Sequence, residues 1–459
     1  MPASTPTCCC GVGRAGDGRE LLIQPARCGP SEEVMITFHD SMMAQLPIFG
    51  SGFASYCFGF PVAPDTQVLA SSLAEVLSTW RIFAGRFRSD GLAIILSDEG
   101  LPFTVRDVAT PVREEESVWH CSDFRNPPRV MKGRAPVATV TLTRFPSGAG
   151  IISVCRSHGL ADGATLAAFL ADWASVVAGK PLEPIKTDRS VYAYPDSLES
   201  ALAEFSQKLG KPITVMPRFK SCGLRLGLKL ACQYDSLLLA AGLSAQQRPR
   251  FLFTTQELKA LKTRASEQLT SVPWITTQEA IIAQLLRTLP AFFGTGPRVG
   301  LLLWLDGKRA LGEAGRRLCS GTCMITKNFE FRITGKSLSK LTEEVHLKLA
   351  AFTASNAACT EEIRLAQGKF QHQLNVPIGP PNMDKLSDCD HKILLNNQSK
   401  IPMIDLGTGP AEWVASTSGP TLLLPRREGI SIYFDSTTVP GSAGSSLPAG
   451  LEDRLRCFD

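Results

Sequence analysis

The sequence predicts a mixed α/β protein in which strands and helices are interleaved through two halves. Apolar residues alternate with threonine in "VATVTLTRF" (137–145), and a second apolar run, "IISVCRSH" (151–158), follows the turn "SGAG", which predicts a β-hairpin. Apolar residues then recur at helical spacing behind this hairpin. The second half mixes strands and helices in the same way, without the regular strand–helix alternation of a doubly wound sheet.

In the first half, apolar residues at spacings of three and four predict a helix over residues 69–85, which Gly85 ends. A short buried strand is expected at 92–96, before the hairpin. The helix behind the hairpin begins near Gly163 and has one apolar face, formed by Leu166, Phe169, Leu170, Trp173, Val176 and Val177.

The second half yields six further elements by the same criteria. The expected strands are 250–255, 298–307 and 429–435. The expected helices are 256–269, 276–292 and 337–353, the second with Thr276 or Thr277 as its N-cap.

A chain of 459 residues favours two domains over one. We expect residues 1–20 to be a disordered tail and 21–200 to be an N-terminal domain. Residues 200–245 have a mixed pattern and are expected to be a crossover segment, followed by a C-terminal domain at 246–459. No internal repeat is detectable.

Composition restricts the class of protein. The chain is 44% hydrophobic and 20% charged, with a net charge of +5, as in ordinary globular proteins. Basic and acidic residues are interleaved, which argues against nucleic acid as a partner. No run of 18 or more apolar residues is present, so no integral membrane span is expected, and without a secretory signal we expect a cytoplasmic monomer.

The 14 cysteines are scattered, apart from Cys8, Cys9 and Cys10, and we interpret them as reduced thiols. The cluster is open to two interpretations, a lipidated segment or part of a disordered tail. No histidine or cysteine spacing predicts a metal site. "GVGRAG" (11–16) has the glycine pattern of a dinucleotide site but lacks a preceding strand and a following helix.

The residues best suited to chemistry are His158 and Asp162, where the hairpin gives way to a helix. His158 ends a strand, and its imidazole can accept a proton near neutral pH and return it. Asp162 lies where the helix needs an N-cap, so we expect it to hold the turn. Gly159 and Gly163 flank this connection and permit a tight bend.

Taken with its surroundings, "SHGLADG" (157–163) resembles the H-x-x-x-D-G signature of the BAHD acyltransferases. "SLAEVLSTWRIFAGRFRSDG" (72–91) is similar to the family's first long helix and the "PLAGRLR" sequence that ends it. "LWLDGKRAL" (303–311) is similar to "VDGRSRL", and "IDLGTGPAEWV" (404–414) to "DFGWGKPVWV". The resemblance implies two chloramphenicol-acetyltransferase-like domains, each a mixed sheet with flanking helices. Wax-ester synthases and condensation domains fit less well, because Ser157 replaces the first of their paired histidines.

The resemblance also implies an activity. An acyl-CoA and an alcohol or amine would meet in a channel between the domains, with His158 as general base in a ternary complex. Acyl-CoA would be a co-substrate, and no further cofactor is expected. A non-catalytic relative that binds acyl-CoA or a partner is the alternative, and a lipid-alcohol acyltransferase at a membrane surface is a third interpretation.

The chain departs from the family in two motifs. Leu406 and Thr408 replace both aromatic residues of the second motif, which keeps Asp405, Gly407 and Gly409. We group Asp405 with His158 as a candidate catalytic residue, although the resemblance implies that this aspartate orders a loop. Lys308 replaces the arginine that pairs with the aspartate of H-x-x-x-D, and the adjacent Arg309 is an alternative partner.

Substrate-binding candidates also follow from the resemblance. Lys259 and Lys262 lie near the segment where the family contacts CoA, although charge runs of this kind usually form a solvated helix face. "NNQSKIP" (396–402) is similar to the acceptor-side "TSWTRLP", which makes Ser399 and Lys400 candidates for acceptor binding, with Lys400 facing an acidic acceptor. Gln398 stands in place of the expected tryptophan and implies a remodelled pocket.

Overall fold

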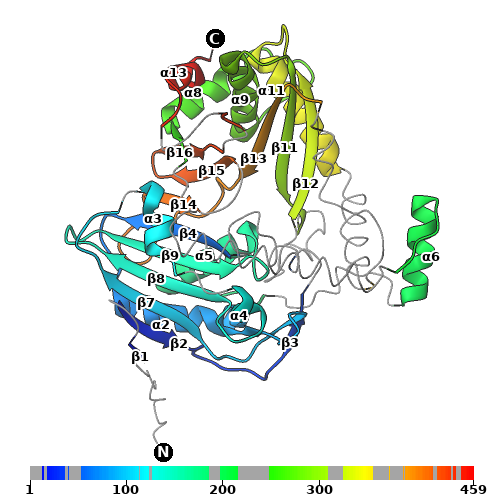
Figure 1. The fold of residues 1–459 in the computed structure, drawn as a ribbon. Coiled ribbons are helices and arrows are strands. Elements are labelled where there is room, and N and C mark those ends of the chain that lie inside the picture. Colours follow the sequence, from blue (N-terminus) through cyan, green and yellow to red (C-terminus); the bar gives the residue numbers. More distant parts are fainter. Residues whose placement is uncertain are drawn as a thin grey trace, which may run out of the picture.

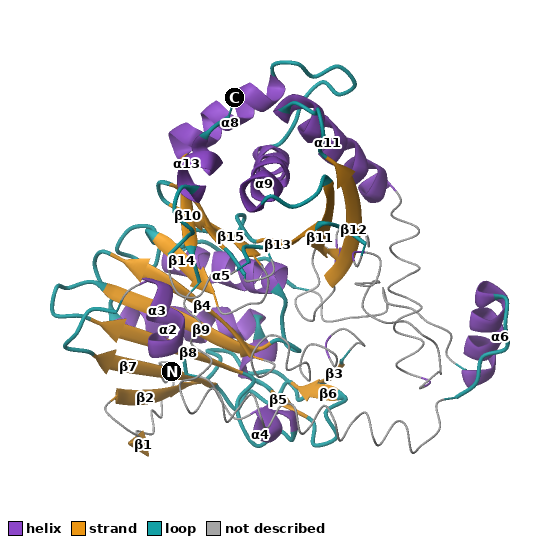
Figure 2. Ribbon diagram, turned by 45° about the horizontal axis from the view of Figure 1, so that its top comes forward, coloured by secondary structure: helices purple, strands orange, loops and turns teal. Residues whose placement is uncertain are grey.

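The computed structural model describes residues 13–14, 18–36, 40, 53–112, 114–123, 127–185, 197–215, 248–308, 324–354, 372, 386, 388–416, 421–435, 438–440 and 446–458. Thirteen of the described strands form one mixed sheet, with helices packed on it in both halves (Figures 1 and 2). The predicted mixed α/β class is confirmed.

The first half of the sheet has the order β1-β2-β7-β8-β9-β4. Its strands are β1 (Gly13–Arg14), β2 (Gly18–Ile23), β7 (Leu101–Asp107), β8 (Ala138–Arg144), β9 (Gly150–Ser157) and β4 (Phe53–Phe60). β8 and β9 form the predicted hairpin, while β7 and β8 are parallel. Every residue of β4 and β9 is buried, as expected of central strands that are covered on both faces.

Helix α5 (Gly163–Val177) packs against α2 (Thr66–Thr79) and against Phe83, which follows α2, through its aromatic residues. The rings of Phe83 and Phe169 stack at 4.2 Å, and the Trp173 indole donates to Ser72 Oγ at 2.9 Å. The helix expected at 69–85 instead begins at Thr66, because the Asp65 side chain caps it, and it ends at Thr79. Residues Arg81–Ala84 form the 3₁₀ turn η2.

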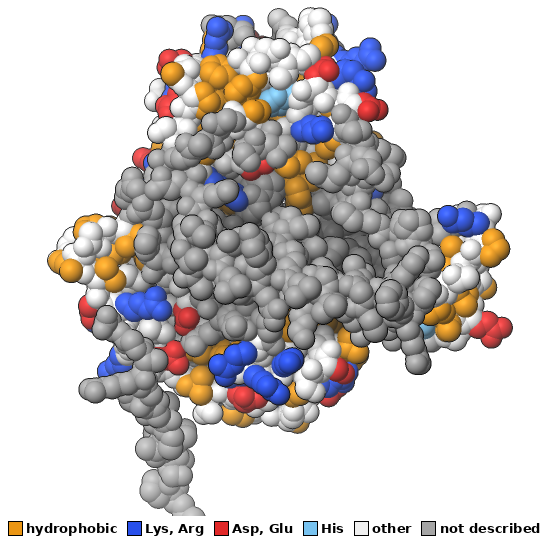
Figure 3. Space-filling view, viewed as in Figure 1, with side chains coloured by type: hydrophobic (Ala, Val, Ile, Leu, Met, Phe, Trp, Pro, Cys, Tyr) orange, Lys and Arg blue, Asp and Glu red, His pale blue; other side chains and the backbone are white. Residues whose placement is uncertain are grey.

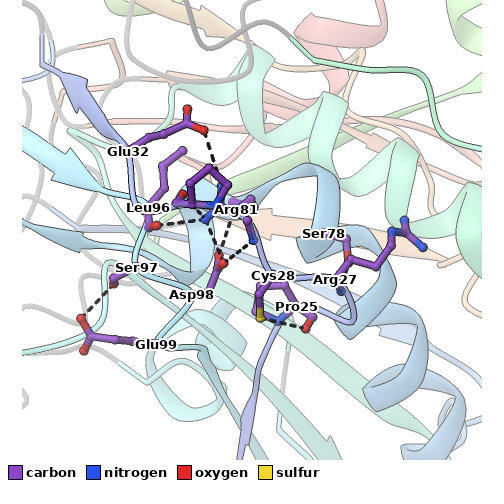
Figure 4. Close-up of polar contacts among 12 residues, drawn as sticks. Pro25, Arg27, Cys28, Glu32, Ser78, Arg81, Leu96, Ser97, Asp98 and Glu99 are labelled. Atoms are coloured by element: carbon purple, nitrogen blue, oxygen red, sulfur yellow. Dashed lines mark hydrogen bonds and ion pairs between the residues drawn. The ribbon is translucent and has the colours of Figure 1, made fainter. Parts of the chain in front are cut away.

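A small second sheet, β3 (Glu33–Met35), β6 (Ala93–Ile95) and β5 (Arg86–Phe87), lies beside η2. The Arg81 guanidinium donates to both carboxylate oxygens of Asp98 at 2.8 Å, and the Gly29 backbone N–H donates to Asp98 Oδ2 at 3.0 Å (Figure 4). The two ionised side chains are only 13% and 7% exposed. This ion pair therefore joins three chain segments around a desolvated carboxylate.

The second half continues the sheet with β15 (Thr421–Arg426), β13 (His391–Asn397), β11 (Arg298–Asp306) and β12 (Met324–Arg332), while β10 (Arg250–Thr254) pairs with β16 (Gly429–Tyr433). The helices are α8 (Thr255–Ser266), α9 (Thr277–Phe293), α11 (Leu338–Ala354) and α13 (Leu451–Arg456). All six predicted elements of this half are confirmed to within a few residues, including Thr276 as the N-cap of α9.

The two halves join where β14 (Trp413–Ser416) pairs with β4. At this junction the Trp413 indole lies directly on the backbone of Gly59, where an added Cβ would meet the ring at 2.0 Å. Glycine at position 59 is therefore required for this packing. Residues including Ile401, Ile404 and Leu406 pack into the core of the first half. Segments from the second half of the sequence thus contribute to the core of the first half.

A buried carboxylate strengthens the same junction. Glu114 of α3 (Glu114–Cys121) is 8% exposed and binds three groups from the second half. Arg250 donates to Glu114 Oε2 at 2.7 Å, and Arg426 and Tyr433 also donate to this carboxylate. Burial and the neighbouring Glu114 raise the pKa of Tyr433, so its hydroxyl stays protonated and donates.

Several segments differ from the sequence-based expectations. β2 begins at Gly18, inside the expected tail of residues 1–20, because it pairs antiparallel with β7. Helix α6 (Leu198–Leu209) lies across the start of the expected crossover at 200–245 and stands apart from the main body (Figure 1). The short helix α4 (Pro127–Met131) was not predicted. Cys8, Cys9 and Cys10 lie outside the described residues.

Replacing Arg81 with methionine should lower the free energy of unfolding by about 3 kcal/mol, because the Asp98 carboxylate would remain buried without its cation. Urea unfolding monitored by circular dichroism measures this change. The matched control is Arg27→Met, since Arg27 and Glu75 form an ion pair that is 68% and 37% exposed. That control should cost less than about 1 kcal/mol, and equal losses in the two variants would contradict the interpretation.

Candidate active site

The candidate site is the turn between β9 and α5. His158 directly follows the last residue of β9, and the Leu160 backbone N–H donates to Ser157 O at 3.0 Å to close the turn. The Asp162 carboxylate then accepts from the Thr165 backbone N–H at 2.8 Å, which is the predicted N-cap of α5. The strand end and the helix start thus fix both ends of the segment that carries His158.

Lys308 reaches this turn from the second half of the sheet. It follows β11, and its ammonium lies 3.1 Å from Asp162 Oδ1 and also contacts Thr165 Oγ1. Lys308 is 4% exposed and Asp162 7% exposed, so the pair is shielded from solvent. Asp162 therefore caps α5 and binds a cation from the other half. Arg309, the alternative partner, lies outside the described residues.

His158 is half-buried, and protein atoms surround its imidazole closely enough to change its titration. Burial, followed by the positive charge of Arg156, lowers the pKa of His158 from 6.5 to about 4. The ring is consequently neutral near pH 7 and able to accept a proton. A half-buried neutral imidazole at the open end of a strand is suited to general-base chemistry.

Sequence reasoning did not identify Tyr56 and Arg156 as members of this site. The Arg156 guanidinium lies 5.2 Å from the centre of the Tyr56 ring, and the Tyr56 hydroxyl donates to Gln398 Oε1 at 2.5 Å. A Cβ at Gly163 would be 3.4 Å from that hydroxyl and 3.6 Å from Gln398 Nε2. Gln398, which replaces the family's tryptophan, therefore lies beside the H-x-x-x-D-G turn. This replacement was the sequence feature that could have pointed to the additional site residues.

The loop of the second motif lies elsewhere. Asp405 is exposed, and its Oδ1 accepts from the Gly407 and Gly409 backbone N–H groups at 2.9 and 3.1 Å. Both glycines have φ near +95°, which favours glycine. A Cβ at Gly407 would lie 3.7 Å from Val177, the last residue of α5.

His158 lies just before the N-terminal end of α5, whereas Val177 is at its C-terminal end. The 15 residues of the helix span roughly 20 Å. Asp405 thus orders its own loop, far from the imidazole. The grouping of Asp405 with His158 as a catalytic residue stays a prediction, and these loop contacts fit the ordering role that the resemblance implies.

The predicted substrate-binding residues lie on two separate segments of the second half. Lys259 and Lys262 are exposed on α8, and Lys400 is exposed just beyond β13. The Ser399 backbone N–H donates to Asn397 Oδ1 at 3.0 Å, and Ser399 directly follows Gln398, whose side chain accepts from Tyr56. Figure 3 shows basic and acidic side chains close to one another at the upper and lower ends of one face.

Two absences hold for the described part of the chain. No three His, Cys, Asp or Glu residues are placed there to hold a metal ion together. None of the helices described has the length and apolar character that crossing a membrane requires.

Comparison with known proteins identifies the family. A family model described as "Transferase family" matches residues 19–291, which is more than half of the 459 residues. The chain belongs to the BAHD acyltransferase family. The resemblance inferred from the H-x-x-x-D-G turn and the flanking motifs is thereby confirmed.

Curated relatives of the family align with parts of the chain. A limonoid 7-O-acetyltransferase of Citrus sinensis is 30% identical over 167 residues, which cover 34% of this chain and 35% of that protein. BAHD acyltransferase BIA1 of Arabidopsis thaliana is 30% identical over 195 residues, covering 39% and 42%. The chain therefore aligns with well under half of the length of these relatives.

Solved structures show the same fold at low sequence identity. Vinorine synthase is 16% identical with a TM-score of 0.57, and the superposition covers 90% of this chain and 93% of that one. TRI101 of F. graminearum, solved with ethyl coenzyme A, is 15% identical with a TM-score of 0.63, covering 93% and 97%. The expected chloramphenicol-acetyltransferase-like fold is confirmed.

Replacing Lys308 with methionine should lower the free energy of unfolding by about 3 kcal/mol, because the buried Asp162 carboxylate loses its cation. Asp162→Asn should lower thermal stability and acyl transfer together. In the double variant the two losses should not add, since each removes the same ion pair. Thermal and urea unfolding of the four proteins measure this coupling, and strict additivity would contradict it. Lys259→Met, on an exposed helix face, is the control and should unfold like the parent.

Proposed function

We propose that the chain is a CoA-dependent acyltransferase that moves an acyl group from acyl-CoA to a hydroxyl or amine of a small-molecule acceptor. One observation carries the proposal: a neutral, half-buried imidazole at the end of β9, on a turn fixed by the α5 cap and by Lys308. Family membership supplies the reaction class.

In the proposed reaction His158 moves one proton twice. It takes the proton from the acceptor O–H or N–H while that atom attacks the thioester carbonyl carbon. The tetrahedral intermediate collapses, the carbon–sulfur bond breaks, and the imidazolium gives the proton to the CoA thiolate. Both substrates are present together, so no acyl-enzyme is formed.

Structures of related proteins support a reaction between two bound substrates. Those of F. graminearum TRI101 hold coenzyme A together with T-2 mycotoxin or with deoxynivalenol. For this chain we propose that Lys259 and Lys262 attract the CoA phosphates and that Ser399 and Lys400 lie on the acceptor side. Lys400 would favour an acceptor that carries a carboxylate.

His158→Ala should abolish acyl transfer, with a loss of at least about 100-fold in kcat/KM, because no other group takes the acceptor proton. Thiol release from acetyl-, malonyl- and aromatic acyl-CoA, each with a panel of alcohols and amines, measures turnover. Circular dichroism checks that the variant is folded. If a folded variant kept full turnover, His158 would not be the base. A parent protein that binds acyl-CoA without thiol release would support the non-catalytic alternative.

The pH dependence should report the low pKa of His158. Protonation of the imidazole removes the base, so kcat/KM should fall only as the pH approaches about 4 and should not fall near 6.5. Initial rates between about pH 4.5 and 8 test this, with circular dichroism at each pH to exclude unfolding. A half-maximal rate near pH 6.5 in the folded protein would contradict the assignment.

A further inference from the structure

Arg156 is a fully buried cation two residues before His158. It lies on β9, opposite Ala54 of β4, and is 1% exposed. Among the residues that the structure describes, no carboxylate lies within ion-pair distance of its guanidinium. A buried arginine without an ion-paired carboxylate is costly, so its other contacts must offset that cost.

The guanidinium donates hydrogen bonds to two backbone carbonyl oxygens, one in the turn and one on the adjacent strand. Its Nε donates to Ala161 O at 3.1 Å, and its Nη1 donates to Ala54 O at 3.1 Å. Ala161 lies between His158 and the cap Asp162, whereas Ala54 belongs to the adjacent strand. Arg156 therefore ties the turn that carries the imidazole to the centre of the sheet.

Tyr56 covers the guanidinium without neutralising it. The Arg156 guanidinium lies 5.2 Å from the centre of the Tyr56 ring. Burial raises the pKa of Tyr56, so its hydroxyl remains uncharged near neutral pH. Although burial lowers the pKa of Arg156, a guanidinium remains protonated in proteins.

Charges of both signs surround the imidazole. Arg156 disfavours its protonation, while the buried carboxylates Asp162 and Asp40 favour it more weakly. The negative charge of Asp162 is in turn bound by Lys308. After burial itself, Arg156 is therefore the group that most strongly favours the neutral ring.

We propose that Arg156 is a positioning residue for acyl transfer, which holds the His158 turn through Ala161 O and places a fixed positive charge on the strand two residues before His158. This inference rests on the proposed function. The charge keeps the ring ready to accept the acceptor proton at neutral pH. It also disfavours the imidazolium that then forms, so the proton passes readily to the CoA thiolate, and both electrons of the carbon–sulfur bond leave with the sulfur.

Three variants separate the charge from the hydrogen bonds. Arg156→Met removes both, and Arg156→Gln removes the charge but keeps an amide donor for one carbonyl, which favours folding. Arg156→Lys keeps the charge and loses the planar guanidinium. Arg144→Met is the matched control, because Arg144 lies on the adjacent strand β8, is 42% exposed and pairs with Asp107.

The first measurement is an NMR titration of the His158 ring, assigned by the signal that a His158→Gln spectrum lacks. Arg156→Met and Arg156→Gln should raise the pKa of His158 by about one unit or more, toward 6.5. Arg156→Lys and Arg144→Met should leave it near about 4. An unchanged His158 pKa in both neutral variants would overturn the proposal.

The second measurement is the pH profile of kcat/KM. Its acidic limb should move to higher pH in the two neutral variants, whereas Arg156→Lys should lower kcat without moving the limb. Loss of activity with an unmoved limb in every variant would mean a purely structural role and would overturn the proposal. The NMR titration needs no turnover, so a parent protein that releases no thiol would refute the proposed function without deciding the role of Arg156.

Discussion

The ion pair between Lys308 and Asp162 is the contact on which the geometry of the site depends. Asp162 ends the turn that carries His158 and starts α5, while Lys308 belongs to the other half of the sheet. Both side chains are nearly fully buried, so water does not solvate either charge. Each charge is stabilised by its partner, and loss of one would leave the other unpaired. Placement of the imidazole is therefore coupled to the correct assembly of the two halves.

The junction between the halves provides that assembly in three ways. β4 and β14 share backbone hydrogen bonds, Trp413 lies on Gly59, and Glu114 accepts from Arg250, Arg426 and Tyr433. These contacts lie inside the sheet and at a desolvated carboxylate. They are not ion pairs between exposed side chains. Lys308 and Gln398, both from the second half, consequently meet the H-x-x-x-D-G turn in a fixed register.

Local sequence patterns predicted the elements with strong periodicity and the central turn. The hairpin, α5 with its Asp162 cap and α9 with Thr276 followed directly from spacing, because side chains of neighbouring residues determine them. β14 could not be predicted in this way, since its partner β4 lies more than 350 residues earlier in the chain.

Buried polar residues were the other group that the sequence did not identify. Arg156 and Glu114 look like ordinary charged residues in the sequence, and only the fold shows that they are desolvated. Asp405 was grouped with His158 because it lies in a family motif, whereas its loop packs at the distal end of α5. A sequence motif thus identifies a residue but does not give its distance from the reacting atoms.

The continuation of one sheet from β9 through β4, β14 and β15 has a consequence for substrate entry. Hydrogen-bonded strands that are packed on both faces do not part by rigid rotation without breaking several backbone hydrogen bonds at once. A small molecule that visits His158 must therefore arrive and leave while the scaffold stays closed. In the proposed reaction, turnover would then be governed by the side chains and loops that border the route, and not by a swinging motion of one half against the other.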